Sequence, residues 1–208
     1  MTITHHLDDA TMMSFAAGSL PSALAAVAVA HIAMCERCRR EVAVHERLGA
    51  ELMAEMVPAG MTRAVPPMPA PSFDADAPRQ FSGEVPGPLA RLAGGSLDDI
   101  GWRWIGPGLW HKPLDPGGQG TLQLIKAGPG ASVPEHSHGG GELTLILRGA
   151  LIDETGTYRA GDVADLDVSV EHHPVADTIE GCICAIANEQ PTRFRGLLAR
   201  LMQRRHGL

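Results

Sequence analysis

The stretch GASVPEHSHGGGELTLILRG, residues 130–149, places two histidines and a glutamate between glycine-containing turns. His136 and His138 are two residues apart, so on a β-strand both side chains project from the same face. Glu142 returns to that face if the glycines between it and His138 follow the strand or turn back evenly. Two imidazoles and a carboxylate on one face predict a binding site for a divalent metal ion.

A second stretch, GDVADLDVSVEH at residues 161–172, supplies a candidate fourth ligand. His172 would complete the set from a later strand. His173 stands beside it, and because neighbouring strand residues face opposite ways, only one of the two can point toward the metal. Asp162 is interpreted as a turn residue rather than a ligand. Three imidazoles and a carboxylate suit divalent zinc, iron, manganese, nickel or copper.

The sequence around these residues is strand-like. Short apolar runs at residues 121–125, 143–147 and 182–186 are separated by glycines at turn-like positions. Such a pattern predicts an antiparallel barrel or sandwich. Cys182 and Cys184 are two residues apart on the last run, so they either line the interior near the metal or pack as small core residues.

The spacing of these residues resembles the two motifs of the cupin family. The first motif matches residue by residue, and the second keeps the spacing between Gly161 and His172. Asp167 and Ser169 stand where the family usually has a proline and a glycine. The resemblance covers about residues 95–190. It implies a β-barrel with the metal inside, and it favours His172 over its neighbour as the last ligand.

A second group of metal-binding residue types lies near the N-terminus, as His31, Cys35 and Cys38. A helix turns by about 100° per residue, so Cys35 lies about 40° from His31 and Cys38 about 20° the other way. All three side chains therefore project from one face. Two thiolates balance the charge of zinc, and a structural zinc site takes four ligands. The candidates for the fourth ligand are other histidines nearby: His5, His6 and, more weakly, His45.

The surrounding sequence predicts three helices followed by a linker. The first helix is capped by Asp8 or Asp9 and ends at Gly18, and the second begins at Pro21 and runs towards residue 34. The third covers residues 36–56, and it carries apolar residues four apart on one face: Val44, Leu48 and Leu52. Prolines then cluster within residues 57–88, which predicts a semi-extended linker.

The N-terminal pattern resembles the zinc-binding anti-sigma domain, and the cupin-like part behind it is similar to the ChrR-type branch of that family. The resemblance spans residues 1–56. It implies a helical bundle around zinc, which occludes the polymerase-binding surfaces of an extracytoplasmic-function sigma factor in the singlet-oxygen response. The implied zinc ligands are His6, His31, Cys35 and Cys38. The family's usual fourth helix would fall in the proline-rich stretch, so it is expected to be short, displaced or absent.

Composition narrows the class of protein. The chain has 208 residues and a formal net charge of -7, which argues against non-specific nucleic-acid binding. Four cysteines in this length are not typical of a secreted disulfide scaffold. The apolar run at residues 20–34 lacks a preceding basic segment and is too short to span a bilayer, so a cytoplasmic location is expected.

The expected fold is therefore a multidomain α+β chain. Residues 1–56 are predicted to form the zinc-binding anti-sigma domain, residues 57–88 a linker, residues 89–195 the cupin domain and residues 196–208 a basic tail. A helix is also predicted over residues 193–203.

The expected function is that of an anti-sigma factor. It would bind and inhibit an extracytoplasmic-function sigma factor, and release it under oxidative stress sensed through the metal-binding cupin. The alternative is a dioxygenase- or isomerase-like cupin metalloenzyme with a zinc-binding interaction module. No catalytic residue is predicted. Around the proposed ligands there is no clear acid–base pair beyond Glu135 and Glu171. A DNA-binding zinc protein fits least, since residues 1–56 lack a concentrated basic face.

Overall fold

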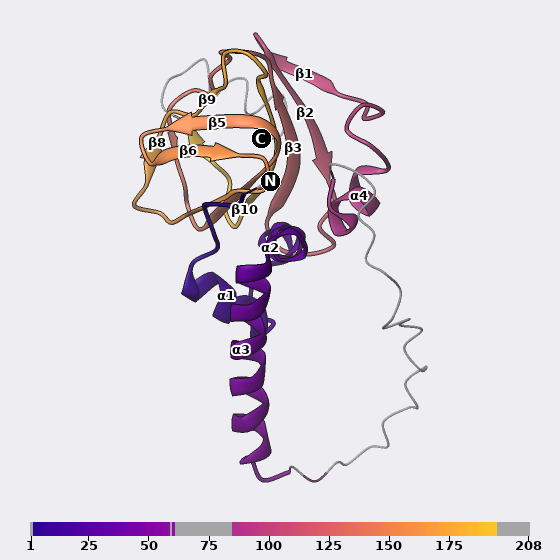
Figure 1. Ribbon diagram of the computed structural model, residues 1–208, viewed down its shortest axis with the longest axis vertical. Coiled ribbons are helices and arrows are strands. Elements are labelled where there is room, and N and C mark those ends of the chain that lie inside the picture. The colour runs from indigo at the N-terminus through magenta and orange to yellow at the C-terminus, as the bar shows by residue number, and fades with distance from the viewer. Residues whose placement is uncertain (1, 59, 61–84, 195–208) are drawn as a thin grey trace.

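A helical part precedes a sheet-rich part in the computed structural model, which describes residues 2–58, 60 and 85–194 (Figure 1). The helices are α1 (Asp9–Ala16), α2 (Ser22–Met34), α3 (Glu36–Ala54) and α4 (Gly87–Ala93). The strands are β1 (Arg103–Gly106), β2 (Leu109–Leu114), β3 (Thr121–Ala127), β4 (His136–Ser137), β5 (Glu142–Asp153), β6 (Gly156–Arg159), β7 (Val163–Leu166), β8 (Glu171–His172), β9 (Val175–Ala176), β10 (Cys182–Asn188) and β11 (Arg193–Phe194). The predicted order of helices followed by strands is confirmed.

The three predicted N-terminal helices are present. The carboxylate of Asp8 caps α1 by accepting a hydrogen bond of 2.6 Å from the amide of Thr11. Pro21 directly precedes α2, and Cys35 separates α2 from α3 in an extended conformation. This one-residue break turns α3 away from α2, so that α3 projects from the rest of the molecule (Figure 1).

Two antiparallel sheets form the rest of the described chain. Eight strands make the larger sheet, with the order β1-β2-β3-β10-β5-β6 and with β7 and β9 also paired to β5. Strands β11, β4 and β8 make the smaller one. All three predicted apolar runs are strands, since they lie within β3, β5 and β10. Among the described residues, no ladder joins β1 to β6.

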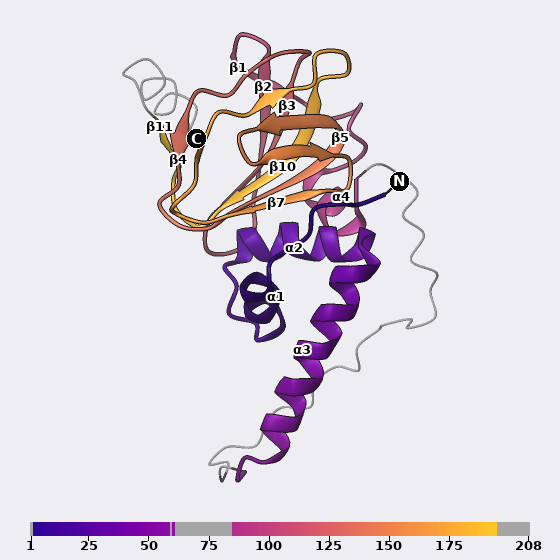
Figure 2. The ribbon, with the colours of Figure 1, turned by 60° about the vertical axis from the view of Figure 1, so that its left-hand side comes forward.

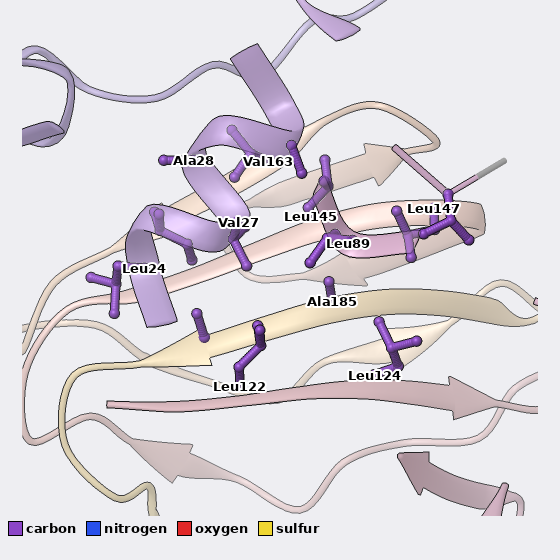
Figure 3. Close-up of a cluster of buried hydrophobic side chains, with 14 of the residues drawn as sticks. Leu24, Val27, Ala28, Leu89, Leu122, Leu124, Leu145, Leu147, Val163 and Ala185 are labelled. Atoms are coloured by element: carbon purple, nitrogen blue, oxygen red, sulfur yellow. The ribbon is translucent and has the colours of Figure 1, made fainter. Parts of the chain in front are cut away.

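Helix α2 lies across the large sheet and connects it to the other helices (Figure 2). Its sequence, SALAAVAVAHIAM, is apolar on almost every side, so the helix must be covered on more than one face. Helices α1 and α3 contact it, as do β3, β5 and β10. Figure 3 shows Leu24, Val27 and Ala28 of α2 in one cluster with Leu145 of β5 and Ala185 of β10. The helical and sheet parts thus share a hydrophobic core.

A short fourth helix, α4, replaces the strand-like structure that we expected from about residue 89. A proline lies in its first turn, and Gly94 ends it with a left-handed φ of 81°, which glycine adopts without strain. Leu89 is fully buried, and α4 packs on α2. A helix thus follows the proline-rich stretch, most of which (residues 59 and 61–84) lies outside the described residues.

The C-terminal prediction is partly wrong. Residues 193 and 194 form β11, which pairs with β4, where a helix over residues 193–203 was expected. Pairing with β4 satisfies the backbone hydrogen-bonding groups of these residues, and helix propensity does not predict such a non-local pairing. The remainder of that helix and the basic tail lie outside the described residues. In the described part of the chain, no helix is long and apolar enough to cross a membrane.

The shared core predicts that a truncation in α2 destabilises the protein. Leu24 is 5% exposed and Leu48, on α3, is 50% exposed. Leu24→Ala should lower the free energy of unfolding by about 2–5 kcal/mol, because it leaves a cavity between α2 and the sheet. The matched control Leu48→Ala should change it by less than about 0.5 kcal/mol. Urea titration measures both values, and equal effects would contradict the packing of α2 on the sheet.

Two candidate metal centres

The first candidate centre joins the N-terminal segment to the break between α2 and α3. His31 lies in the last turn of α2, Cys35 forms the break, and Cys38 lies in the first turn of α3. His6 comes from the segment before α1. One ligand atom of each of these four residues lies within 4.8 Å of the others. The structure thus brings together the three residues with helical spacing and one of the candidate upstream histidines.

The hydrogen bonds of His31 leave one ring nitrogen aimed at this group. Its Nδ1 lies 3.0 Å from the carbonyl oxygen of Gly161, which can only accept, so Nδ1 carries the proton. Its Nε2 is buried without a hydrogen-bond partner. Burial lowers the pKa of His31 to about 4, so the ring is neutral at pH 7. A neutral imidazole with a free, buried lone pair fits a metal ligand.

The thiols of the group are also buried. The sulfur atoms of Cys35 and Cys38 lie 3.3 and 3.7 Å from Nδ1 of His6. Burial raises the pKa of the Cys38 thiol to about 12, so a neutral thiol is favoured when no cation is close. Burial and the nearby charge of Arg37 lower the pKa of His6. A divalent cation would reverse the preference of the thiols by stabilising their ionised form.

The other two histidines considered for this site lie elsewhere. His5 faces the sheet, where its Nδ1 lies 3.4 Å from a carboxylate oxygen of Asp162 and its ring packs on Tyr158 at 4.4 Å between centroids. His45 lies further along α3 and is not in the group. Of the three histidines considered, His6 is the one that lies in the group, and the family resemblance implied the same residue.

The second candidate centre lies where β4, β5 and β8 meet. His136 and His172 are directly paired across β4 and β8, and their Nε2 atoms are 3.1 Å apart. Nε2 of His138 lies 3.3 Å from Nε2 of His172. Glu142 begins β5, and its Oε2 lies 3.2 Å from Nδ1 of His138. These four side chains are all buried, and their ligand atoms lie within 4.8 Å of one another.

The proton positions at this centre favour a cation. Nδ1 of His136 lies 2.9 Å from the carbonyl oxygen of Pro134, and Nδ1 of His172 lies 2.8 Å from a carboxylate oxygen of Asp153. Both acceptors require a proton on Nδ1, so when these rings are neutral their Nε2 lone pairs face each other. Burial lowers the pKa of His136, which favours its neutral form. A metal ion between the rings would remove the repulsion between these lone pairs.

The charge of Glu142 adds to this preference. Burial opposes its ionisation, but its hydrogen bond with His138 and the charge of that ring lower the pKa of the carboxyl group below its usual value. The hydroxyl of Thr144 donates a 3.1 Å hydrogen bond to its Oε1. The donor set is therefore three imidazoles and an ionised carboxylate, which suits a divalent transition metal.

His173 is exposed and points away from the centre, whereas His172 is 4% exposed. The alternation of strand side chains explains why only one of the two adjacent histidines reaches the group. No sequence signal pointed to Asp153, which orients His172. None pointed to the wider part played by Asp162, which bonds to the amide of Arg159 within its turn and to the N-terminal segment.

A cavity of about 460 Å³ opens beside the second centre. His136, Glu142 and His172 form part of its wall, and Cys182 and Cys184 line it as well. Both cysteines are buried, and the hydrogen bond that the Cys184 thiol donates to Cys182, together with burial, raises the pKa of the Cys184 thiol well above its usual value. They therefore line the interior and also pack in the core.

Comparisons with known proteins agree with this architecture. Residues 92–192 match the family model described as the ChrR cupin-like domain. The anti-sigma-E factor ChrR of Cereibacter sphaeroides is 37% identical over 98% of both chains. The solved structure of Rhodobacter sphaeroides SigE in complex with the anti-sigma ChrR superposes with a TM-score of 0.76 at 37% identity, covering 90% of this chain and all of the matched one.

The match to the Cereibacter sphaeroides protein extends over both candidate metal centres and over the helices as well as the sheets, whereas the family model covers residues 92–192. Identity at this level along almost the whole chain excludes a likeness restricted to one domain. The predicted resemblance is confirmed: the chain belongs to the family of the anti-sigma factor ChrR, with a cupin fold preceded by helices.

Proposed function

We propose that this protein is an anti-sigma factor that binds and inhibits an extracytoplasmic-function sigma factor. The observation that carries the proposal is the match to ChrR, a chain seen in complex with SigE, over nearly the full length. The role is regulatory rather than catalytic. Because sigma factors act on RNA polymerase, the protein is placed in the cytoplasm.

The proposed division of labour follows the order of the parts. Residues 1–56 hold the sigma factor, residues 57–88 act as a linker, and residues 89–195 form a metal-binding cupin barrel ahead of the basic tail at 196–208. Helix α3 supports the first assignment, since it projects from the molecule (Figure 1). Its apolar residues at spacing four are about half exposed: Val44 at 50%, Leu48 at 50% and Leu52 at 59%. An apolar stripe left uncovered on one helix is typical of a protein interface.

The proposed metal in the N-terminal centre is zinc, bound by His6, His31, Cys35 and Cys38, because two thiolates and two imidazoles are a common structural zinc set. The cupin centre would hold zinc or another divalent transition metal at His136, His138, Glu142 and His172. Zinc in the first centre would tie the N-terminal segment to α2 and α3. The metal in the second would hold β4, β5 and β8 together.

The proposed signal is oxidative, of the singlet-oxygen type, and the cupin senses it. Imidazole rings and thiols are both oxidisable. Both types of group line the cavity beside the cupin centre. Release of a tightly held partner requires a large loss of binding free energy, since each ~1.4 kcal/mol changes affinity tenfold. Loss of a buried metal ligand can supply such a change, whereas modification of an exposed side chain cannot.

Metal content tests both centres. We expect about two metal ions per full-length chain, since each group supplies four ligands. His6→Ala and His172→Ala should each remove about one of these ions, because a three-ligand remnant binds far more weakly. His45→Ala and His173→Ala are matched controls that should keep both. Elemental analysis of the purified proteins gives the answer, and full metal content in His6→Ala would disprove the first site.

The exposed stripe on α3 predicts where the sigma factor binds. Leu48→Glu places a charge in the middle of the stripe and should weaken binding of the sigma factor by at least about tenfold. Ile179→Glu is the control, because Ile179 is 84% exposed on a turn of the sheet part. It should leave affinity unchanged. Calorimetry with the full-length chain measures both, and equal affinities would remove α3 from the interface.

Release under singlet oxygen tests the sensor. A photosensitiser in the light should dissociate the complex formed by the wild-type chain and by His173→Ala, which keeps the cupin ligands. His172→Ala should bind the sigma factor more weakly in the dark and release little more of it in the light, since the ligand whose loss releases the partner is already absent. Size-exclusion chromatography separates free from bound sigma factor. Equal release from all three proteins would show that the N-terminal centre, and not the cupin, senses the oxidant.

A further inference from the structure

The ligand His6 is held in place by the sheet on both of its flanks. Before it, the carboxylate of Asp162 accepts hydrogen bonds from the amides of Thr4 and His5, at 2.7 and 3.0 Å. After it, the carboxylate of Asp165 on β7 accepts from the amide of Asp8 at 3.0 Å. Figure 2 shows this segment passing beside β7 before α1 begins. The position of His6 therefore depends on the end of β6 and on β7.

The same turn orients a second N-terminal ligand. Gly161 accepts the hydrogen bond from Nδ1 of His31, and Asp162 is the next residue. The side chain of Asp162 is 1% exposed. A buried carboxylate with this many donors is costly to displace, because each donor would lose its partner away from water. The turn between β6 and β7 thus sets the positions of two of the four ligands in the N-terminal centre.

The hairpin of β5 and β6, which precedes this turn, positions a ligand of the cupin centre. Asp153, at the end of β5, orients His172 through Nδ1, and its side chain is 1% exposed. Burial opposes ionisation of Asp153, but hydrogen bonds from His172 and Thr155 lower its pKa to about 2, so it is a carboxylate at pH 7. Its Oδ1 also accepts from the amides of Thr155 and Gly156, at 2.8 and 3.1 Å.

Tyr158 connects these two parts of the sheet. Its hydroxyl lies 2.8 Å from the hydroxyl of Thr155, which in turn bonds to Asp153. Its ring, on β6, packs on the ring of His5 with 4.4 Å between centroids. His5 is the neighbour of the ligand His6. A continuous set of contacts therefore runs from a cupin ligand to an N-terminal ligand through residues 153–162.

We propose that the hairpin of β5 and β6 and the turn that follows couple the two candidate metal centres, with Asp153, Tyr158 and Asp162 as positioning residues. A displacement of His172 moves Asp153 and the hairpin, and the movement reaches the N-terminal ligands through Tyr158 and the turn at Gly161. The inference rests on the proposed function, since it requires metal in both centres. It supplies a route by which a change in the cupin loosens the part that holds the sigma factor.

Cobalt in the N-terminal centre of the full-length chain tests the coupling, because thiolate-bound cobalt absorbs visible light differently from cobalt held by nitrogen and oxygen alone. The rate at which excess chelator removes the thiolate-bound cobalt is the measured quantity. Asp162→Asn keeps the size of the side chain but removes its charge. It should raise the rate about 10–100-fold, the usual effect of losing a residue that orients a metal ligand.

Asp153→Asn is the decisive variant, because among the eight candidate metal ligands Asp153 bonds to His172 alone. It should raise the rate at which cobalt is lost from the thiolates by at least about threefold, because residues in one network of contacts are energetically coupled. In a Tyr158→Phe background, which removes the hydroxyl and keeps the ring, Asp153→Asn should have no further effect. Asp177→Asn is the matched control, since within the described part of the chain that carboxylate accepts hydrogen bonds from amides of its own turn and contacts neither centre.

Urea unfolding, monitored by tryptophan fluorescence, checks folding independently of metal. The three tryptophans lie in or beside β1 and β2, at positions 102, 104 and 110. If Asp153→Asn folds and loses thiolate-bound cobalt at the wild-type rate, the proposed coupling is wrong. That result would not contradict the proposal of two metal centres. If the wild-type chain shows no thiolate–cobalt absorption, the N-terminal metal site itself is wrong, and the coupling with it.

Discussion

Helix α2 has no polar face, and this constraint organises the molecule. A helix that is apolar all round is stable only when it is covered on more than one side. Helices α1 and α3 cover part of α2 and the large sheet covers another part, so Leu24, Val27 and Ala28 belong to the same core as residues of β5 and β10 (Figure 3). The last turn of α2 carries His31, so this packing also brings the N-terminal centre against the turn between β6 and β7. The helical part and the sheet part are thus joined by a shared core.

Both candidate centres use the same chemical arrangement. In each, the Nδ1 proton of at least one buried imidazole is committed to an oxygen acceptor, the carbonyl of Gly161 for His31 and the carboxylate of Asp153 for His172. The other nitrogen then presents a lone pair to neighbouring ligand atoms. The acceptors belong to adjoining segments of the sheet, which is why a disturbance at one centre has a structural route to the other. Under the proposed function, such a route would let a change at the cupin centre reach the helical part.

Family membership explains features that packing does not. The apolar stripe on α3 is exposed to water in the isolated chain, and a bound sigma factor would cover it. The wall of the cavity beside the cupin centre combines candidate metal ligands with two thiols. These features make sense together if the helical part binds and the cupin senses.

The sequence by itself determined the local structure. Caps, glycines and apolar periodicity placed α1, α2, α3 and the main strands, and short spacings identified His31, Cys35 and Cys38 as well as the cupin ligands, because these depend on the geometry of a few neighbouring residues. Tertiary structure alone decided which upstream histidine joins the first centre, since His5 and His6 differ only in which side of the extended segment faces α2 and which faces the sheet. It also decided that residues 89–93 are helical, where α4 buries Leu89 against α2, and that Asp153 and Asp162 contact candidate metal ligands or the segments that carry them. Those contacts join residues that lie apart in the chain, so only the folded structure brings them together.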